Sequence, residues 1–304
     1  MIARKGLESH GAYPFFVPKS FVTKMEKGNP RDPLLLQILP RPEELFQVDG
    51  FCDDPLQEQN TGTACPLLQK YEGRVLLLAT NQCAVHCRYC FRRNLKKQPS
   101  IALARFLQDD PRIFPPEVIL SGGDPLRLSD DELAELAAML RSRPQVRRIR
   151  IHTRFPVVEP KRLTPCFLTA IQSDRKTVFS MVLHVNHPRE IDADFADAIT
   201  EAVDRGIPIF IQSVLLRDVN DDFAALFELY EKSISLRMTP YYLHQLDRVA
   251  GAAHFEVDVR HGLELMDRLQ RSLPGYAVPR YVREIPGAAS KTPVSASVLP
   301  KKSP

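Results

Sequence analysis

Short apolar runs alternate with longer amphipathic segments along most of the chain, and this alternation constrains the fold more than any other feature. The apolar runs have the length of strands and comprise residues 75–79, 118–120, 149–151, 178–185, 208–215 and 238–243. The main amphipathic segments have the length of helices and comprise residues 129–142, 192–205, 221–235 and 258–273. Strand and helix thus alternate about six times, which predicts right-handed βα units around a parallel sheet. We therefore expect an α/β fold, either a doubly wound sheet or a complete or partial barrel.

Two flanking regions lack this alternation. Residues 1–70 are Pro-rich and irregular, with short amphipathic pieces at 21–26 and 33–39, so we expect an N-terminal cap of helical and irregular structure. Residues 71–293 would form the βα domain, and residues 294–304, rich in Ser, Pro and Lys, a loose C-terminal tail. In βα domains ligands bind where strands end and βα loops begin. Residues that directly follow the predicted strands are therefore the first candidates for a site.

The composition is that of an ordinary globular protein. Of the 304 residues, 44% are hydrophobic and 26% are charged, which argues against a disordered, collagen-like or repeat-array chain. The net charge of +4 is too small and too dispersed to indicate a nucleic-acid surface, and it suits small anionic ligands equally well. The N-terminus has no apolar signal core, and no window approaches the roughly 20 apolar residues of a membrane span. We expect a soluble cytoplasmic protein without nucleic-acid or membrane partners.

Three of the six cysteines, Cys83, Cys87 and Cys90, lie close together directly after the first predicted strand. In a reducing compartment, clustered thiols are more often metal ligands or catalytic groups than disulfides. A structural zinc site usually has four ligands in paired Cys-x-x-Cys motifs; this chain has no second pair, and His86 lies on the same tight loop. Three cysteines can instead hold a cubane of four irons in which one iron has no protein ligand. The remaining cysteines are scattered and have no assigned role; they are Cys52, Cys65 and Cys166.

The spacing Cys-x-x-x-Cys-x-x-Cys after the first strand of a βα barrel resembles the radical S-adenosylmethionine (SAM) superfamily, in which SAM chelates the open iron. The resemblance implies a partial TIM-type (β/α)6 barrel, a [4Fe-4S] cluster on these cysteines and SAM as a cofactor. Tyr89, which precedes the third cysteine, also fits the superfamily pattern. The resemblance further implies SAM contacts at Gln212 and at a Gly-rich turn after the second predicted strand, made of Ser121, Gly122, Gly123 and Asp124. Paired glycines let the backbone approach a ligand closely.

The run Pro286-Gly-Ala-Ala-Ser-Lys291-Thr-Pro resembles the pyridoxal phosphate (PLP) loop of lysine 2,3-aminomutases. Taken alone, Lys291 is an ordinary solvated lysine beside the tail. In that family the lysine forms a Schiff base with PLP, which requires an amine that can lose its proton in a site of low polarity. The resemblance extends over roughly residues 15–295, and its strongest stretches are residues 25–30, 70–75, 184–188, 212–221 and 240–244.

Five more positions match functional residues of that family. Tyr71 and Arg74 match the pair that flanks PLP, and a forked guanidinium suits a dianionic phosphate. Arg92 matches the arginine that holds the substrate carboxylate, and without the resemblance it would be surface charge. Asp247 and Glu284 match two acids that bind the distal ammonium of lysine, although the long clostridial-type enzymes carry Asp at the position of Glu284. An arginine facing two acids implies a substrate with a carboxylate at one end and a cation at the other.

Departures from the long enzymes narrow the resemblance to a short bacterial branch that makes β-lysine for elongation factor P. The long enzymes continue past the PLP lysine with a Cys-bearing zinc segment, whereas only residues 292–304 follow Lys291 and none of them is Cys. Residues 251–255 and 290–293 match the short branch, while Ile211 departs from the usual Asn and is assigned no contact. The implied activity is isomerisation of L-lysine to β-lysine, expected as the R form. An external electron donor and a separate elongation factor P ligase are the implied partners.

Two alternatives stay open at the level of the sequence. The same cluster could serve a radical enzyme acting on another amino acid, for which Asp247 and Glu284 would be the discriminating residues. The three clustered cysteines could instead stabilise a non-catalytic zinc-binding module, which iron and sulfide analysis would distinguish from an iron–sulfur protein.

Overall fold

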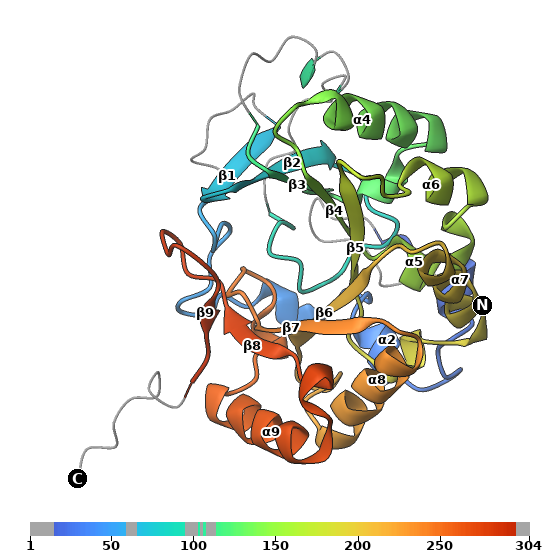
Figure 1. Cartoon of the computed structure of the whole chain (residues 1–304). Helices are drawn as coiled ribbons and strands as arrows, with labels where there is room; N and C mark the ends of the chain where they lie inside the picture. The colour runs from blue at the N-terminus through green and yellow to red at the C-terminus, as the bar shows by residue number, and fades with distance from the viewer. Residues whose placement is uncertain (1–14, 59–65, 95–102, 104–105, 108–113, 296–304) are drawn as a thin grey trace.

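The computed structural model describes residues 15–58, 66–94, 103, 106–107 and 114–295. Within this part of the chain one nine-stranded sheet follows the sequence order of its strands. Strands β2 to β8 are parallel to one another. The edge strands β1 and β9 pair antiparallel with β2 and β8. The strands are β1 Leu67–Tyr71, β2 Arg74–Thr80, β3 Glu117–Gly122, β4 Arg148–Thr153, β5 Val178–His184, β6 Ile209–Leu215, β7 Thr239–Gln245, β8 Arg280–Arg283 and β9 Thr292–Pro293. The described strands curve without closing into a full ring, so the fold is the expected partial barrel (Figure 1).

Helices cover the outer face of the curved sheet (Figure 1). They are α4 Asp130–Ser142, α5 Phe155–Val158, α6 Pro165–Ala170, α7 Ala193–Asp204, α8 Phe223–Ser235 and α9 Val259–Ser272. Polar side chains cap the N-termini of the long helices. A capping box begins α4, since Ser129 Oγ accepts from Glu132 N at 3.2 Å and Glu132 Oε2 accepts from Ser129 N at 2.7 Å. Asp192 caps α7 by accepting from Phe195 N, and Asp222 caps α8 by accepting from Ala225 N.

Side chains alternate between the two faces of the strands. In β4, Ile149 and Ile151 are fully buried under the helices, whereas Arg150 and His152 line a cavity on the inner face. In β6, Ile211 is buried and Gln212 lines the same cavity. This two-residue period separates an apolar outer layer from an inner face that carries polar groups.

The N-terminal region packs across the sheet through two short helices, α1 Lys19–Val22 and α2 Pro33–Leu36. Phe21 and Leu34 are fully buried and belong to the main hydrophobic core. Asp32 begins α2 by accepting from Leu34 N at 2.9 Å and from Leu35 N at 3.0 Å. Both helices are shorter than the amphipathic pieces expected at 21–26 and 33–39. α2 packs on the barrel at the level of the cysteine loop, where the backbone N–H of Arg88 donates to Gln37 O at 2.8 Å. α1 packs against α5, where Ser20 Oγ donates to Val158 O at 2.5 Å.

The structure confirms the six predicted strands and the four long helices, and it adds β1, β8 and β9. The added strands are short, and β1 and β8 carry charged residues, so neither shows the apolar run that marks a buried strand. The tail expected to be loose from residue 294 starts instead with a buried residue, Val294. Its backbone N–H donates to Tyr281 O at 2.9 Å. Residues 1–14 of the cap, Cys65, and residues 296–304 of the tail lie outside the described part of the chain.

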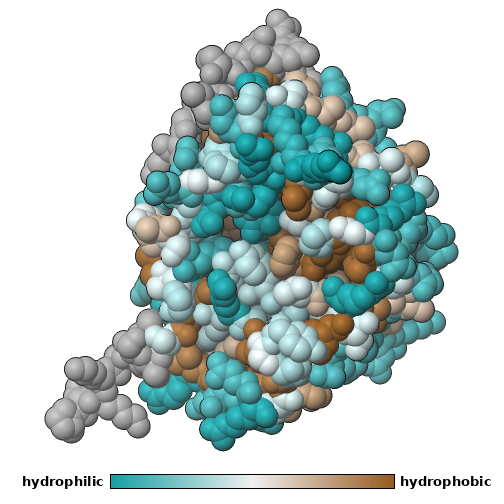
Figure 2. All heavy atoms as spheres, viewed as in Figure 1, coloured by the Kyte–Doolittle hydropathy of each residue, from teal (hydrophilic) through white to brown (hydrophobic). Residues whose placement is uncertain are grey.

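In the view of Figure 1, hydrophilic residues cover much of the upper part of the molecule, and hydrophobic residues gather near its middle (Figure 2). Among the described residues, no helix is both long enough and apolar enough to span a membrane.

Candidate active site

A cavity of about 290 Å³ lies on the inner face of the sheet, at the ends of the strands where ligands of βα domains bind. Every site residue predicted from the sequence lines this cavity. These residues are Tyr71, Arg74, Cys83, Cys87, Tyr89, Cys90, Arg92, Ser121, Gly122, Gly123, Asp124, Gln212, Asp247, Glu284 and Lys291. They come from separate stretches of the chain, and the fold brings them together.

The cysteine loop follows β2, and Cys83, Cys87 and Cys90 all line the cavity. Backbone turns shape the loop, with Cys90 N donating to Cys87 O at 3.1 Å. Burial raises the pKa of the Cys83 thiol above its ordinary value, and the charges of the other two cysteines and Asp124 act in the same direction. Among the described residues, no group of three potential ligands converges as a single metal ion requires. Three thiols on one loop suit a multi-iron cluster, in which each cysteine binds its own iron.

The Gly-rich turn packs directly against the segment that leads into the cysteine loop. Gly123 N donates to Thr80 O at 2.6 Å, and Asp124 N donates to Gln82 O at 2.7 Å. A Cβ on Gly123 would lie 2.3 Å from Gln82 O, and one on Gly122 would lie 2.6 Å from Thr80 O. The sequence suggested that these glycines admit a ligand; the structure shows that they also admit the neighbouring backbone.

Asp124 holds the end of β4 with its buried carboxylate. Its Oδ1 accepts from Thr153 Oγ1 at 2.6 Å, and its Oδ2 accepts from Arg154 N at 2.8 Å. Burial raises its pKa despite these hydrogen bonds, which act to lower it. The carboxylate thus joins the Gly-rich turn to the next βα junction.

Five side chains of alternating charge cross the cavity from Arg92 to Lys291. Arg92 donates from Nε to Glu58 Oε2 at 2.6 Å and from Nη2 to Glu58 Oε1 at 3.0 Å. Lys70 Nζ lies 2.7 Å from Glu58 Oε1 and 3.2 Å from Glu284 Oε1. Lys291 Nζ in turn donates to Glu284 Oε2 at 2.6 Å. The candidate PLP lysine is therefore linked by ion pairs to the candidate carboxylate-binding arginine.

Glu58 was not predicted from the sequence. It lies at the end of the N-terminal region, and its side chain is only 2% exposed. Burial acts to raise its pKa, but the charges and hydrogen bonds of Arg92 and Lys70 outweigh burial and leave the pKa below its ordinary value. Nothing near position 58 in the sequence distinguishes this acid from a surface glutamate, because its partners lie in β1 and in the cysteine loop.

The two candidate ammonium-binding acids differ in protonation. Burial, followed by the charge of Glu284, raises the pKa of Asp247 to about 7. Burial acts on Glu284 in the same direction, but Lys291 and Lys70 outweigh it and lower the pKa of Glu284 to about 2. At neutral pH Glu284 is therefore ionised, whereas Asp247 titrates close to neutrality. Asp247 can therefore lose its proton when another cation enters, which gives the pair of acids a second negative charge.

Tyr71 and Arg74 lie opposite each other where β1 pairs with β2. The guanidinium of Arg74 stacks over the Tyr71 ring, 4.5 Å from its centroid. Burial raises the pKa of Tyr71 and the charge of Glu284 raises it further, so the hydroxyl stays protonated. A cation and a phenol thus stand together at the edge of the cavity next to the Lys291 ion pairs.

Three histidines on the inner face were also missed, namely His152, His184 and His244. Burial lowers the pKa of each, and for His184 burial together with Arg154 lowers it to about 3. His184 Nε2 lies 2.9 Å from Tyr89 Oη, and His184 pairs with Gln212 in the β5–β6 register. Neutral imidazoles supply hydrogen-bonding groups without adding charge. The available sequence signal was their position on inward-facing sites of predicted strands.

The comparisons with known proteins agree with this geometry. The family model of the radical SAM superfamily matches residues 77–230. The chain is 44% identical to L-lysine 2,3-aminomutase of Haemophilus influenzae over 285 residues, covering 91% of this chain and 83% of that protein. It is 42% identical to L-lysine 2,3-aminomutase of Escherichia coli, with 91% of this chain and 82% of that protein covered. The enzyme of the same name from Clostridium subterminale is 36% identical, and the match covers 90% of this chain and 67% of that enzyme.

Solved structures support the fold. A radical SAM methyltransferase from Sphaerobacter thermophilus has a TM-score of 0.50 at 20% identity, covering 72% of this chain and 69% of that chain. Streptococcus suis SuiB bound to S-adenosylmethionine has a TM-score of 0.50 at 13% identity, covering 71% of this chain and 51% of that chain. At these identities the likeness concerns the fold alone.

Proposed function

The chain belongs to the lysine 2,3-aminomutase family of the radical SAM superfamily, and from this membership we propose that it is an isomerase converting L-lysine to β-lysine. The observation that carries the proposal is one cavity whose lining brings together three cysteines, the lysine Lys291, the arginine Arg92 and the two acids Asp247 and Glu284. A radical enzyme for another amino acid would not require the two acids. The same curated relatives and the absence of a converging metal site among the described residues leave little support for a zinc module.

The residues around the cysteine loop fit a [4Fe-4S] cluster and SAM. Cys83, Cys87 and Cys90 would hold three irons, and the backbone of the Gly-rich turn and the side chains of Tyr89 and Gln212 would line the place of SAM. When bound, the cluster supplies an electron, SAM supplies the group that removes hydrogen, and PLP delocalises the unpaired electron while nitrogen moves. The chain itself provides orientation and exclusion of water, and most of the exposed lining of the cavity is apolar, which suits the exclusion of water.

The residues around Lys291 fit PLP. Arg74 offers a forked donor for a phosphate, and Tyr71 offers a protonated hydroxyl beside it. Lys291 supplies the amine, which must lose a proton before it reacts with an aldehyde. The ion pair with Glu284 holds the ammonium in place until then. Once the Lys291 ammonium has lost its charge, Glu284 still pairs with Lys70 but has lost one cationic partner, so it can accept another cation.

The charges at the two ends of the cavity select the substrate. Arg92 would offer Nη1 to a carboxylate, which would share or replace its contacts with Ser121 Oγ at 3.1 Å and Gly122 O at 3.5 Å, while Glu58 holds Nε and Nη2. Asp247 and Glu284 provide the opposite charge for the distal ammonium. Lysine has both groups at the two ends of one flexible chain. A neutral side chain would bring no additional cation to these acids, and an anionic one would be repelled by them in a buried site.

We further propose that the β-lysine serves the modification of elongation factor P, through a separate ligase, and that an external protein donates the electron. The support is the resemblance to the short bacterial branch and the higher identity to the Haemophilus influenzae and Escherichia coli relatives than to the Clostridium subterminale enzyme. The cytoplasm, where lysine and elongation factor P are found, is the proposed location. Intact-mass analysis of elongation factor P from a strain lacking this chain would test the proposal, since the mass of one added β-lysine should be missing.

The cofactor assignment is tested by spectroscopy on the chain purified without oxygen. The parent chain should contain iron and sulfide and should show PLP absorbance that sodium borohydride fixes to the protein. Lys291→Ala should lose the borohydride-fixed PLP while keeping its iron, and the exposed matched control Lys161→Ala should behave as the parent. PLP fixed equally well to Lys291→Ala would reject the assignment of Lys291.

A further inference from the structure

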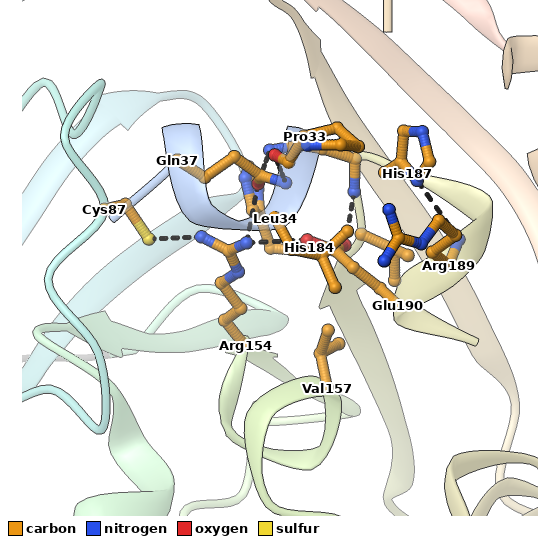
Figure 3. Close-up of polar contacts among 12 residues, drawn as sticks. Pro33, Leu34, Gln37, Cys87, Arg154, Val157, His184, His187, Arg189 and Glu190 are labelled. Atoms are coloured by element: carbon orange, nitrogen blue, oxygen red, sulfur yellow. Dashed lines mark hydrogen bonds and ion pairs between the residues drawn. The ribbon is translucent and has the colours of Figure 1, made fainter. Parts of the chain in front are cut away.

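Arg154 contacts a candidate cluster ligand and was not identified from the sequence. It follows β4 directly, is 6% exposed, and its guanidinium reaches from that strand end to the cysteine loop (Figure 3). Its Nη1 donates to Cys87 Sγ at 2.8 Å and to Tyr89 Oη at 2.7 Å. A hydrogen bond from a cation therefore ends on one of the sulfurs that would bind iron.

The other side of the guanidinium is held by two fixed acceptors. Nη2 donates to Glu190 Oε1 at 2.7 Å and to Gln37 Oε1 at 2.6 Å. Glu190 is fully buried, and its second oxygen accepts from Asn186 N at 2.8 Å. Figure 3 shows Gln37 at the end of α2, and Glu190 on the opposite side of the Arg154 guanidinium from Cys87. The guanidinium is thus fixed in orientation by groups that do not contact the cysteines.

A merely structural role would not require a cysteine as partner. Arg154 does connect α2 to the barrel through Gln37, but the backbone hydrogen bond from Arg88 N to Gln37 O already joins the same helix to the cysteine loop. The Nη1 group is instead turned toward Cys87, one of the three candidate iron ligands, and toward Tyr89, which directly precedes another. The placement of this donor suits a role toward the cluster.

We propose that Arg154 is a positioning residue that raises the reduction potential of the cluster, and that Glu190 moderates this effect. The proposal rests on the proposed function, in which Cys87 binds iron. Hydrogen bonds to the sulfurs and net charge are among the factors that set the potential of an iron–sulfur cluster. Reduction adds one electron from an external donor to the cluster and makes or breaks no bond. A nearby cation stabilises the more negative, reduced form, and a nearby carboxylate destabilises it.

The two members of the pair should therefore shift the potential in opposite directions. Arg154→Gln removes the charge and weakens the donor, so the ratio of reduced to oxidised cluster at a fixed potential should fall at least tenfold, a shift of about −59 mV for a one-electron couple. Glu190→Gln removes the negative charge and keeps an oxygen for Asn186 N, so the potential should rise. Arg162→Gln is the matched control, because Arg162 donates to Leu126 O and Leu128 O, away from the cysteines, and its potential should equal that of the parent.

The experiment is a redox titration of the reconstituted, full-length chain with dithionite, without SAM, followed by electron paramagnetic resonance of the reduced cluster. Iron per chain is measured for every variant. A lower reduction potential in Arg154→Gln together with a higher one in Glu190→Gln supports the proposal, and the reverse pair of shifts overturns it. Equal potentials in both variants and the parent, or shifts in the same direction, overturn it.

Failure of one variant to fold does not leave the question open. If Arg154→Gln holds no iron, a higher potential in Glu190→Gln supports the proposal, and an unchanged or lower one overturns it. If neither variant holds iron while the parent does, Arg154 and Glu190 serve cluster assembly, and the effect on potential is rejected. A parent chain that binds no iron would reject the proposed function itself, and with it this inference.

Discussion

Lys291 Nζ lies 2.6 Å from Glu284 Oε2, and the short antiparallel pairing of β8 with β9 explains why. Arg283 pairs with Thr292, so the next residue of each strand toward the loop, Glu284 and Lys291, lies beside the other. Pro286 and Gly287 form the connection, and Gly287 has a positive φ of 77° that suits glycine. The chain thus places an amine and a carboxylate side by side at the mouth of the cavity.

Glu284→Gln should lower kcat/KM for lysine about ten- to a hundredfold, because a charged hydrogen bond contributes roughly 1.5–3 kcal/mol. The variant keeps the shape of the side chain, so borohydride-fixed PLP should persist. The measurement is β-lysine formation over a range of lysine concentrations. Glu228→Gln, which alters an exposed pair with Lys232 on α8, is the control and should match the parent. A Glu284→Gln enzyme with parental kcat/KM would contradict the role of Glu284 in lysine binding.

Asp247→Asn should impair lysine turnover while leaving reductive cleavage of SAM intact, because Asp247 belongs to the substrate end of the cavity. The raised pKa of about 7 adds a signature. Below that pH the free site holds Asp247 protonated, and above it the carboxylate attracts the distal ammonium, so kcat/KM should rise with pH through about 7. The rise attributable to this group should be absent from Asp247→Asn. Loss of SAM cleavage together with turnover would show that the residue acts elsewhere.

Glu58→Ala should destabilise the protein by about 3–5 kcal/mol, the usual cost of leaving buried charges such as Arg92 and Lys70 without their partner. Chemical denaturation measures the difference from the parent. Because the pKa of Glu58 is lowered in the folded chain, its contribution is present above the ordinary value of 4.5 and is lost as the pH falls through the folded pKa. The control Glu201→Ala breaks an exposed pair with Arg205 and should cost less than about 1 kcal/mol. Equal costs for the two variants would refute the assigned burial of the Glu58 pairs.

Gly123→Ala should displace the cysteine loop, because the added methyl group meets the backbone that leads into that loop. The new methyl group would lie 2.3 Å from Gln82 O, so the segment that leads to Cys83 must move, at a cost of about 1–3 kcal/mol. Iron per chain after reconstitution should fall below that of the parent. Gly275→Ala is a matched control, since no atom lies within 4 Å of its added carbon. Parental iron content in Gly123→Ala would show that the turn tolerates a side chain.

The periodic part of the fold could be predicted from the sequence, because the two-residue and 3.6-residue patterns report which face of an element is buried. Strand β8 escaped prediction because Arg280 and Arg283 flank only two buried residues, Tyr281 and Val282. Its place is determined by pairing with β7, which is a tertiary interaction rather than a local preference.

The residues of the candidate site likewise fall into two groups, those that can be predicted from the sequence and those that cannot. The cysteines, the Gly-rich turn and the Lys291 loop are motifs whose members are close in sequence. Glu58 and Arg154 show no such pattern, because their partners Arg92 and Cys87 lie 34 and 67 residues away in the chain. Contacts of this kind depend on how successive βα units close around the cavity, and a single sequence does not reveal them.

The most direct test of the proposed activity is product analysis. The chain, reconstituted with iron, sulfide and PLP, is incubated without oxygen with L-lysine, SAM and dithionite, and the products are separated on a chiral column. The account predicts β-lysine, as the R form, only when SAM and reductant are both present. Cleavage of SAM without any β-lysine, in a preparation with full cluster and PLP, would contradict it.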